Sequence, residues 1–317
     1  MKANRKVLFI DTVHPLIKET FEQKGFRCDF FPDYAYEDFL KIIPDYEGVI
    51  IRSKIPLDRN ILNKAGNLRF IGRVGAGMEN IDLAFAKSKG IACFNSPEGS
   101  RDAVGEHTVG LLLSLFRNIH KADREVRKGE WIREANRGLE LKDKTFGIIG
   151  YGNMGSAFAE KLSGFGARVI SYDKYKKAYA DKHTREVDMD TIYAETDILS
   201  LHVPLTRETT YLFNSAYLQK FKKNIFLINT ARGLCVDTLQ LVEGLKTGKV
   251  RGAAIDVLEY EDKSFEMLDK QGLPEAYRYL AGSDNVVLTS HIAGWTHESK
   301  YKLAKVLVDK IMNYLKQ

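Results

Sequence analysis

The chain is poor in the features that mark secreted, membrane-spanning and nucleic-acid-binding proteins. Its three cysteines are widely spaced and form no CxxC pair, a pattern that indicates reduced thiols in a cytoplasmic protein. The N-terminus shows no apolar segment with a cleavage site, and no apolar run approaches the ~20 residues that span a bilayer. The net charge is +6, but no block of five like charges occurs. We therefore expect no nucleic acid, membrane or metal as a partner.

Length and composition are those of a soluble globular enzyme or binding protein. The chain has 317 residues, of which 44% are hydrophobic and 28% charged. This length suits two domains better than one. The mild positive excess would suit an anionic substrate.

Short apolar runs alternate with helix-like segments along most of the chain. Such alternation indicates βαβ units and mainly parallel sheets, which is the α/β class. The segment 103–116 is apolar on most faces and continues as a polar helix to about residue 128, so its first part must be buried in the core or against a second subunit. The stretch 259–284 shows no clear period. The expected strands are 7–10, 27–31, 48–51, 69–73, 91–94, 145–149, 167–172, 198–203, 225–229, 253–257 and 286–289. The other expected helices are 15–24, 36–43, 58–65, 83–89, 156–162, 238–245 and 298–314.

One glycine-rich turn carries the strongest functional signal. The motif Gly150-Tyr151-Gly152-Asn153-Met154-Gly155 lies between an expected strand and helix, and the next strand ends at Asp173. This order is the dinucleotide fingerprint: Gly150 permits a tight turn, Gly152 lets the backbone approach a pyrophosphate, and Gly155 permits close packing. The free N–H groups of the helix start favour phosphates. Asp173 can bind the ribose hydroxyls and would repel a 2′-phosphate, so NAD is expected over NADP.

The acid is followed by basic residues that bear on this preference. Lys174, Lys176 and Lys177 come directly after Asp173. They could attract a 2′-phosphate and soften the preference for NAD, or they could form an ordinary solvated turn. We favour the solvated turn.

Three later strand ends each deliver one polar side chain. Arg232, Glu261 and His291 follow expected strands, and ligands of open parallel sheets bind at the carboxyl ends of strands. Arginine can hold a carboxylate through two parallel hydrogen bonds. Histidine can move a proton to or from an oxygen, and a glutamate can orient the imidazole. Glu259 and Asp262 are neighbouring acids that could be confused with Glu261.

These motifs together resemble those of the D-isomer-specific 2-hydroxyacid dehydrogenases, over nearly the whole chain. The resemblance implies an Arg–Glu–His triad at Arg232, Glu261 and His291. Asp262 departs from the pattern, because the family usually has proline there. The matching segments are Asn95-Ser96-Pro97, Ala103-Val104-Gly105-Glu106-His107-Thr108, Gly129-Glu130-Trp131, 147–155, His202-Val203-Pro204-Leu205-Thr206, 229–233 and 290–294.

The resemblance also implies an architecture and further contacts. A Rossmann NAD-binding domain, 98–286, is expected to be inserted into a flavodoxin-like substrate domain made of 1–97 and 287–317. The backbone N–H groups of Val74, Gly75 and Ala76 are expected to bind the substrate carboxylate, and a homodimer is expected around the helix 103–116. His107 is expected to pack or pair within that helix. Further cofactor contacts are expected at Asn153, Met154, His202, Val203, Pro204, Thr206, Thr230, Ala231, Asp256 and Gly294.

Within this family the chain looks most like the D-3-phosphoglycerate dehydrogenases of serine biosynthesis. Arg52 and Lys54 follow the third expected strand, where that group places cations toward the substrate phosphate, and Arg73 is a further cation. They could also be ordinary charges at strand ends. Two alternatives stay open: a glyoxylate or hydroxypyruvate reductase, and a non-catalytic NAD-sensing protein like the corepressors related to this family.

Overall fold

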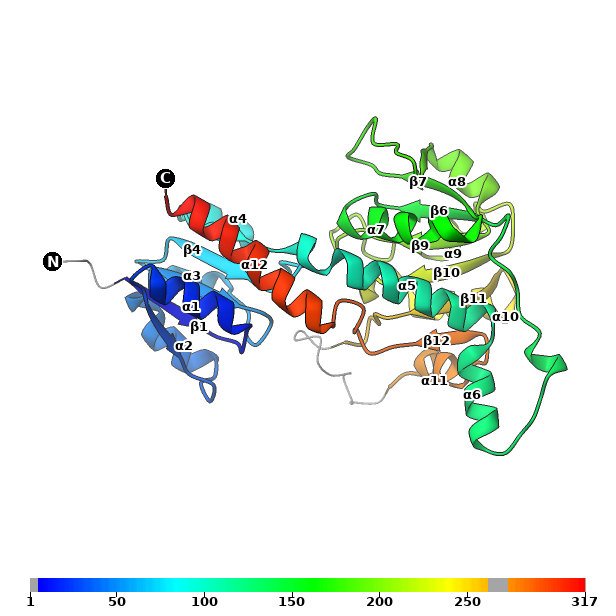
Figure 1. The fold of residues 1–317 in the computed structure, drawn as a ribbon, viewed down its shortest axis with the longest axis horizontal. Coiled ribbons are helices and arrows are strands. Elements are labelled where there is room, and N and C mark those ends of the chain that lie inside the picture. The colour runs from blue at the N-terminus through cyan, green and yellow to red at the C-terminus, as the bar shows by residue number, and fades with distance from the viewer. Residues whose placement is uncertain (1–4, 262–272, 317) are drawn as a thin grey trace. The chain divides into compact units, whose positions relative to one another are not determined.

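The computed structural model describes residues 5–261 and 273–316, which form two compact units. The first unit contains residues 5–100 and 295–316 (Figure 1), and the second, inserted between them, contains 101–261 and 273–294. The insertion that the resemblance implied is thus present. The second change of unit lies at 294/295 rather than at 286/287, because the strand at Val286–Leu288 pairs in parallel with Val250–Ile255.

The first unit is a three-layer α/β sandwich around a parallel five-stranded sheet. Its strand order is β2-β1-β3-β4-β5, which is the flavodoxin-like order. Side chains alternate between the two faces, so that Val7 and Phe9 lie under α1 and α12 while Leu8 and Ile10 lie under α2 and α3. The elements are β1 Lys6–Phe9, α1 Pro15–Gln23, β2 Arg27–Phe30, α2 Tyr36–Ile42, β3 Gly48–Ile51, α3 Arg59–Lys64, β4 Phe70–Arg73, α4 Leu83–Ser88, β5 Ala92–Phe94 and α12 His297–Tyr314.

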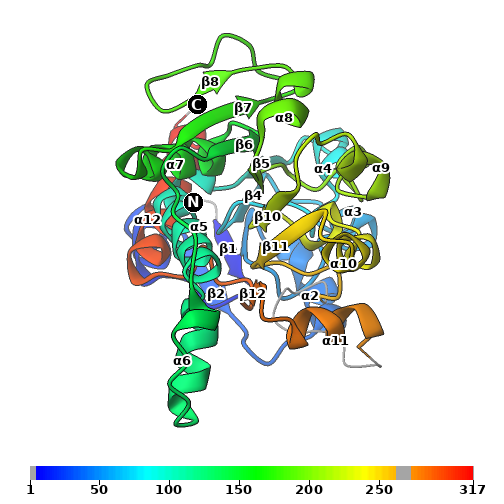
Figure 2. The same ribbon diagram turned by 90° about the vertical axis from the view of Figure 1, so that its right-hand side faces the viewer.

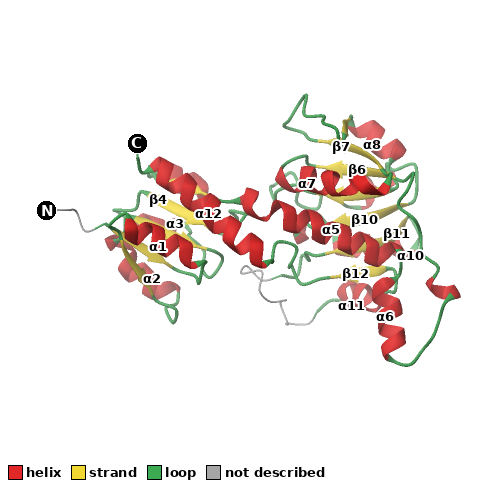
Figure 3. Cartoon of the chain, viewed as in Figure 1, coloured by secondary structure: helices red, strands yellow, loops and turns green. Residues whose placement is uncertain are grey.

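The second unit is built on a parallel sheet of order β12-β11-β10-β9-β6-β7-β8. The order reverses between β6 and β9, which defines the switch point where dinucleotides bind in such sheets. Figures 2 and 3 show the helices on both sides of this sheet. The elements are α5 Arg101–Phe116, α6 Ile119–Arg127, β6 Thr145–Ile149, α7 Asn153–Leu162, β7 Arg168–Tyr172, β8 Arg185–Glu186, α8 Met189–Glu195, β9 Ile198–Leu201, α9 Ser215–Gln219, β10 Ile225–Asn229, α10 Thr238–Lys246, β11 Val250–Ile255, α11 Glu275–Gly282 and β12 Val286–Leu288.

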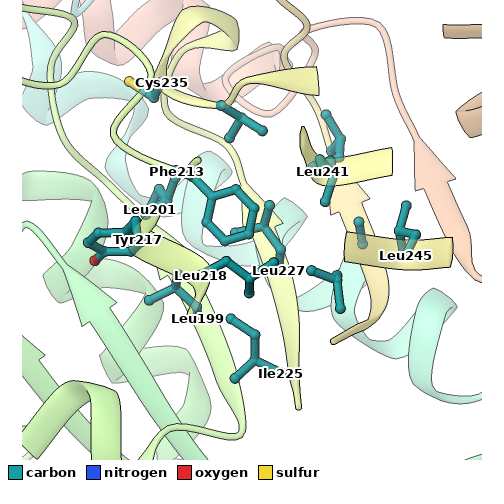
Figure 4. Packing of buried hydrophobic residues seen from close by; sticks show 14 of the residues in the cluster. Leu199, Leu201, Phe213, Tyr217, Leu218, Ile225, Leu227, Cys235, Leu241 and Leu245 are labelled. Carbon is teal, nitrogen blue, oxygen red and sulfur yellow. The ribbon is translucent and has the colours of Figure 1, made fainter. Parts of the chain in front are cut away.

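The apolar residues of this sheet form a core on each face. One core packs α8, α9, α10 and α11 against the sheet, and Figure 4 shows Phe213 and Leu227 at its centre. The other core packs α5 and α7, with Leu112 and Phe158 fully buried. Strands buried on both faces are what near-continuous apolar runs predict.

The structure corrects one expected helix and adds several short ones. The segment 103–128 is not one helix, because Asn118 has φ +52°, a left-handed conformation that ends α5 before α6 begins. The N–H of Leu139 donates to the last carbonyl of α5, at Phe116 (2.7 Å). The elements β8, α8, α9 and α11 were not expected, since segments of two to eight residues show too little periodicity.

Among the described residues, no helix combines the length and the apolar character that crossing a membrane requires.

Candidate active site

The glycine-rich turn lies at the switch point, and each of its glycines has a different reason to lack a side chain. Gly150 has φ +90°, and a Cβ there would lie 2.6 Å from the carbonyl oxygen of His202. A Cβ on Gly155 would lie 2.1 Å from the carbonyl oxygen of Gly150. A Cβ on Gly152 would meet nothing within 4 Å, so the backbone there faces open space. The turn therefore leaves room for a ligand at Gly152, directly before the first turn of α7 at Asn153 and Met154.

Asp173, at the end of β7, fastens the turn to the neighbouring strand. Its Oδ2 accepts from the N–H of Tyr151 (2.9 Å), and its Oδ1 accepts from the N–H groups of Tyr175 and Lys176. Two of the lysines that follow have partners of their own: Lys174 pairs with Glu208, and Nζ of Lys176 donates to the carbonyl of Tyr151 (2.9 Å). Asp173 and the residues after it therefore form a hydrogen-bonded turn at the end of β7.

His202 lies on the other side of the switch point, directly after β9. Its N–H donates to the carbonyl of Ile149 (2.8 Å), and its Nε2 lies 2.8 Å from the hydroxyl of Ser200. Burial lowers the pKa of His202 to about 3, so the imidazole is neutral and supports the loop without moving protons at neutral pH. After it, Val203 packs on the core, and the hydroxyl of Thr209 donates to Pro204 (2.6 Å) and lies 3.2 Å from that of Thr206.

The turn after β10 presents Arg232. The buried amide of Asn229 shapes it, because its Nδ2 donates to the carbonyl of Arg232 (3.0 Å) and its Oδ1 accepts from the N–H of Ala231 (3.1 Å). Thr230 is buried beside the hydroxyl of Thr108 (3.3 Å). A Cβ on Gly233 would lie 2.0 Å from the carbonyl oxygen of Leu258, so this turn packs on the backbone that leads to Glu261.

Glu261 and His291 form a hydrogen-bonded pair. Oε2 of Glu261 lies 2.7 Å from Nδ1 of His291, and its Oε1 accepts from the N–H of Leu258. Since a carboxylate only accepts, Nδ1 carries a proton, and Nε2 is the nitrogen that can exchange one with a ligand. Glu259 does something else: its Oε1 accepts from the N–H of Thr238 (3.0 Å) at the start of α10. Asp262 lies outside the described residues.

Asp256, at the end of β11, is the polar centre of the loop that carries His291. It is 1% exposed, and its carboxylate accepts from the hydroxyl of Thr289 (2.6 Å) and the N–H groups of Ile292 (2.9 Å) and Ala293 (3.0 Å). Its own carbonyl accepts from the N–H of His291 (2.8 Å). Burial alone would raise the pKa of Asp256, but the hydrogen bonds from the His107 and Thr289 side chains and from the loop outweigh burial and lower it.

His107 pairs within this network rather than merely packing in its helix. Its Nε2 lies 3.1 Å from the hydroxyl of Thr289 and 3.4 Å from Oδ1 of Asp256. The sequence predicts Asp256 only as a cofactor contact, and the structure adds its role as the anchor of the loop. A carboxylate at the end of an apolar strand was the available signal, because a buried charge requires several donors. Gly294 closes the loop as the last residue of the second unit.

The expected substrate cations lie in the first unit, and their surroundings differ. Arg52 follows β3 and stacks its guanidinium 4.8 Å from the ring centroid of Trp295, and no carboxylate among the described residues forms an ion pair with it. The Nζ of Lys54 donates to the carbonyl of Pro32. The guanidinium of Arg73 folds back over Gly75, where a Cβ would lie 1.5 Å from its Nη1.

The backbone after β4 can supply two N–H groups to a ligand, rather than the expected three. The N–H of Val74 is engaged in the sheet, where it donates to the carbonyl of Ile51 (2.8 Å). The N–H of Gly75 makes a long bond to the hydroxyl of Ser96 (3.3 Å). For the N–H of Ala76, no acceptor is found within residues 5–261 and 273–316. Gly75 and Ala76 therefore remain as candidate donors.

Comparison with known proteins places this geometry in a family. Residues 109–293 match the NAD binding domain of the D-isomer specific 2-hydroxyacid dehydrogenases. The D-3-phosphoglycerate dehydrogenase of Archaeoglobus fulgidus is 33% identical over 98% of this chain, which spans 57% of that relative's length. The hydroxypyruvate reductase of Thermotoga maritima is 37% identical over 88% of both chains. The D-lactate dehydrogenase of Aquifex aeolicus, solved with NAD and lactic acid, has a TM-score of 0.83 at 29% identity, with 98% of this chain and 95% of that chain covered. The chain therefore belongs to the D-isomer specific 2-hydroxyacid dehydrogenases, a family of NAD-dependent oxidoreductases.

Proposed function

We propose that this chain reduces a 2-oxo acid to a D-2-hydroxy acid, and catalyses the reverse oxidation, with NAD(H). The observation that carries the proposal is the 2.7 Å bond between Oε2 of Glu261 and Nδ1 of His291, beside the Arg232 turn. NAD(H) supplies or accepts the hydride at C2. His291 donates a proton through Nε2 to the carbonyl oxygen in reduction and removes it in oxidation. Arg232 holds the carboxylate through two hydrogen bonds.

The proposal assigns the dinucleotide and the substrate carboxylate to different residues. The second unit binds the dinucleotide, with the pyrophosphate at Gly152 and the ribose hydroxyls at Asp173. Gly75 and Ala76 of the first unit give N–H groups to the substrate carboxylate. The support is the open space at Gly152 and the spare donor at Ala76.

The substrate we favour is D-3-phosphoglycerate with its oxo acid, 3-phosphohydroxypyruvate, which would place the reaction in serine biosynthesis. Arg52 is the strongest support, because its guanidinium stacks on Trp295 and no carboxylate within residues 5–261 and 273–316 forms an ion pair with it. A dianionic phosphate needs at least one such fixed cation. The match to the Archaeoglobus relative, which covers 98% of this chain and 57% of that relative, supports the same substrate.

A hydroxypyruvate or glyoxylate reductase is the second candidate. It is favoured by the Thermotoga relative, which is more similar (37%) and matches over 88% of its own length. The two candidates differ in whether the substrate carries a phosphate.

The deciding experiment is a panel of 2-oxo acids assayed with NADH and with NADPH. We expect the highest kcat/KM with NADH and 3-phosphohydroxypyruvate. A preference for hydroxypyruvate or glyoxylate would establish the reductase instead. Binding of NADH without turnover of 3-phosphohydroxypyruvate, hydroxypyruvate, glyoxylate or pyruvate would favour the NAD-sensing, non-catalytic alternative.

We also propose that the chain forms a homodimer in the cytoplasm, through the region of α5 and the segment that follows it. The apolar residues Leu112 and Phe116 of α5 are buried in the second unit's own core. The exposed apolar side chains gather further along, at Ile119, Val126, Trp131 (80% exposed) and Ile132, around α6, which extends past the sheet in Figures 1 and 2. Light scattering should report a dimer for the wild type and a monomer for Trp131→Glu with Ile132→Glu. A monomeric wild type would refute the dimer.

A further inference from the structure

We propose that His107 is a positioning residue that holds the His291 loop in its working conformation through Thr289 and Asp256. The inference rests on the proposed function, since it takes His291 as the proton carrier. His107 lies on α5, 182 residues from Thr289 in the sequence, and its side chain is partly buried (22% exposed) beside Asp256. It touches neither Glu261 nor His291 through any interaction found among the described residues.

The donors and acceptors of this network can be ordered. Asp256 is a carboxylate with a lowered pKa and therefore only accepts. The hydroxyl of Thr289 has a single proton, which it donates to Oδ1 of Asp256 (2.6 Å). The oxygen of Thr289 must then accept from His107, whose Nε2 lies 3.1 Å away. His107 is thus the start of a directed chain of hydrogen bonds, from imidazole to hydroxyl to carboxylate.

The series of hydrogen bonds ends at the loop that carries His291, and this loop needs surrounding contacts to keep its backbone conformation. His291 has φ +55°, which residues with a Cβ adopt only where the surroundings hold them. Three consecutive N–H groups converge on Asp256: that of His291 on its carbonyl, and those of Ile292 and Ala293 on its carboxylate. The orientation of the His291 imidazole toward Glu261 depends on this local conformation.

His107 fixes the orientation of the Thr289 hydroxyl and thereby selects one pattern of hydrogen bonds around Asp256. Without a donor at Nε2 of His107, the Thr289 hydroxyl can rotate to other acceptors. The buried carboxylate of Asp256 then loses its interactions with both His107 and Thr289. The loop could then relax from φ +55° at His291, which would misplace the imidazole while the glycine-rich turn, on a different strand, stays intact. A role in packing alone would require only the volume of the ring.

The test compares His107→Phe, which keeps the ring volume and removes the donor, with His107→Gln, whose Nε2 amide restores a donor at nearly the same place. Glu106→Gln, exposed on the same turn of α5, is the control for the helix. We expect His107→Phe to lower kcat at least about tenfold, as loss of orientation of a general acid can. NADH affinity should change far less, and His107→Gln should recover most of the lost kcat. Wild-type kcat in His107→Phe, or equal losses in Phe and Gln variants that bind NADH normally, would overturn the proposal.

A second readout needs no turnover. The Nδ1 proton of His291, which lies in the bond to Glu261, should give a downfield NMR signal that is absent in His291→Ala. The inference predicts that this signal shifts or broadens in His107→Phe and returns in His107→Gln; an unchanged signal in His107→Phe contradicts it. If the wild type turns over no 2-oxo acid, the proposed function fails, while this signal still decides the role of His107.

Discussion

The polar side chains that follow the strands are held by buried hydrogen bonds in the second unit and are more exposed in the first. In the second unit, buried hydrogen bonds hold the site: the amide of Asn229 donates to the carbonyl of Arg232, and the carboxylate of Asp256 accepts from the loop that follows His291. In the first unit, Arg52 leans on a Trp295 that is 65% exposed, and Lys54 is exposed. We infer that the reacting groups are held rigidly, whereas the groups that read the rest of the substrate can change without disturbing the fold. That division suits a family whose members act on different hydroxy acids.

The largest effect should come from the hydrogen-bonded groups of the second unit. His291→Ala should lower kcat by about 100-fold or more, because general acid–base catalysis typically contributes that much. Binding of NADH, measured by fluorescence titration, should survive, since the glycine-rich turn is unaltered. Near-normal turnover in this variant would mean that another group carries the proton.

Arg232→Lys should cost about tenfold to 100-fold in kcat/KM. Lysine keeps the charge but cannot make two parallel hydrogen bonds to a carboxylate, and a charge-assisted bond is worth about 1.5–3 kcal/mol. The loss should be similar for phosphorylated and unphosphorylated 2-oxo acids, because all of them carry the carboxylate. A loss confined to one acid would show that Arg232 reads another part of the substrate.

Removal of a cation in the first unit should mainly affect the substrate that carries a phosphate. Arg52→Ala should lower the preference for 3-phosphohydroxypyruvate over hydroxypyruvate about tenfold or more, through loss of one charge-assisted contact. Lys54→Ala should lower it less, because the ammonium is already bonded to Pro32. The ratio of kcat/KM for the two acids is the measurement, and equal ratios in wild type and Arg52→Ala would remove Arg52 from phosphate recognition.

The smallest effect concerns stability and the buried His202. Its pKa is about 3 in the folded chain and 6.5 when unperturbed. The unfolded state therefore binds the proton more readily, and stability falls as the pH drops from 6.5 toward 3. Between pH 7 and 5.5 the wild type should lose about 1 kcal/mol more free energy of unfolding than His202→Gln. Urea unfolding at the two pH values measures this; equal losses would show that the imidazole is protonated in the folded state.

Most of the site could be predicted from the sequence because its parts sit at strand ends. Long, strongly apolar strands such as Thr145–Ile149 are recognisable, and a polar residue that follows a parallel strand must lie at the same sheet edge as its counterparts. Glu261 was placed correctly next to His291, although Glu259 is only two residues away. Glu259 and Tyr260 lie in a turn, where side chains follow no regular period, so periodicity alone could not have separated the two glutamates.

What the sequence could not supply were the contacts between distant segments. The bond of Val74 to the neighbouring strand depends on register, and the meeting of His107 with Thr289 depends on how α5 crosses the sheet. The end of α5 at Asn118 was also hidden: asparagine can adopt the left-handed conformation but also continues helices, and the bond from Leu139 to the last carbonyl of α5 joins segments that are distant in the sequence.

Gly152 has one consequence for how this chain can be studied and how it can evolve. A Cβ at Gly152 would meet no atom within 4 Å, whereas a Cβ at Gly150 or Gly155 would collide with backbone, so among these three glycines Gly152 is the one that separates ligand binding from folding. Gly152→Ala should therefore leave the fold unchanged and weaken NAD(H) binding, because the added Cβ would lie where the backbone faces the ligand. Natural selection can keep a glycine at that position solely through the ligand, whereas the two flanking glycines would be retained by the polypeptide itself.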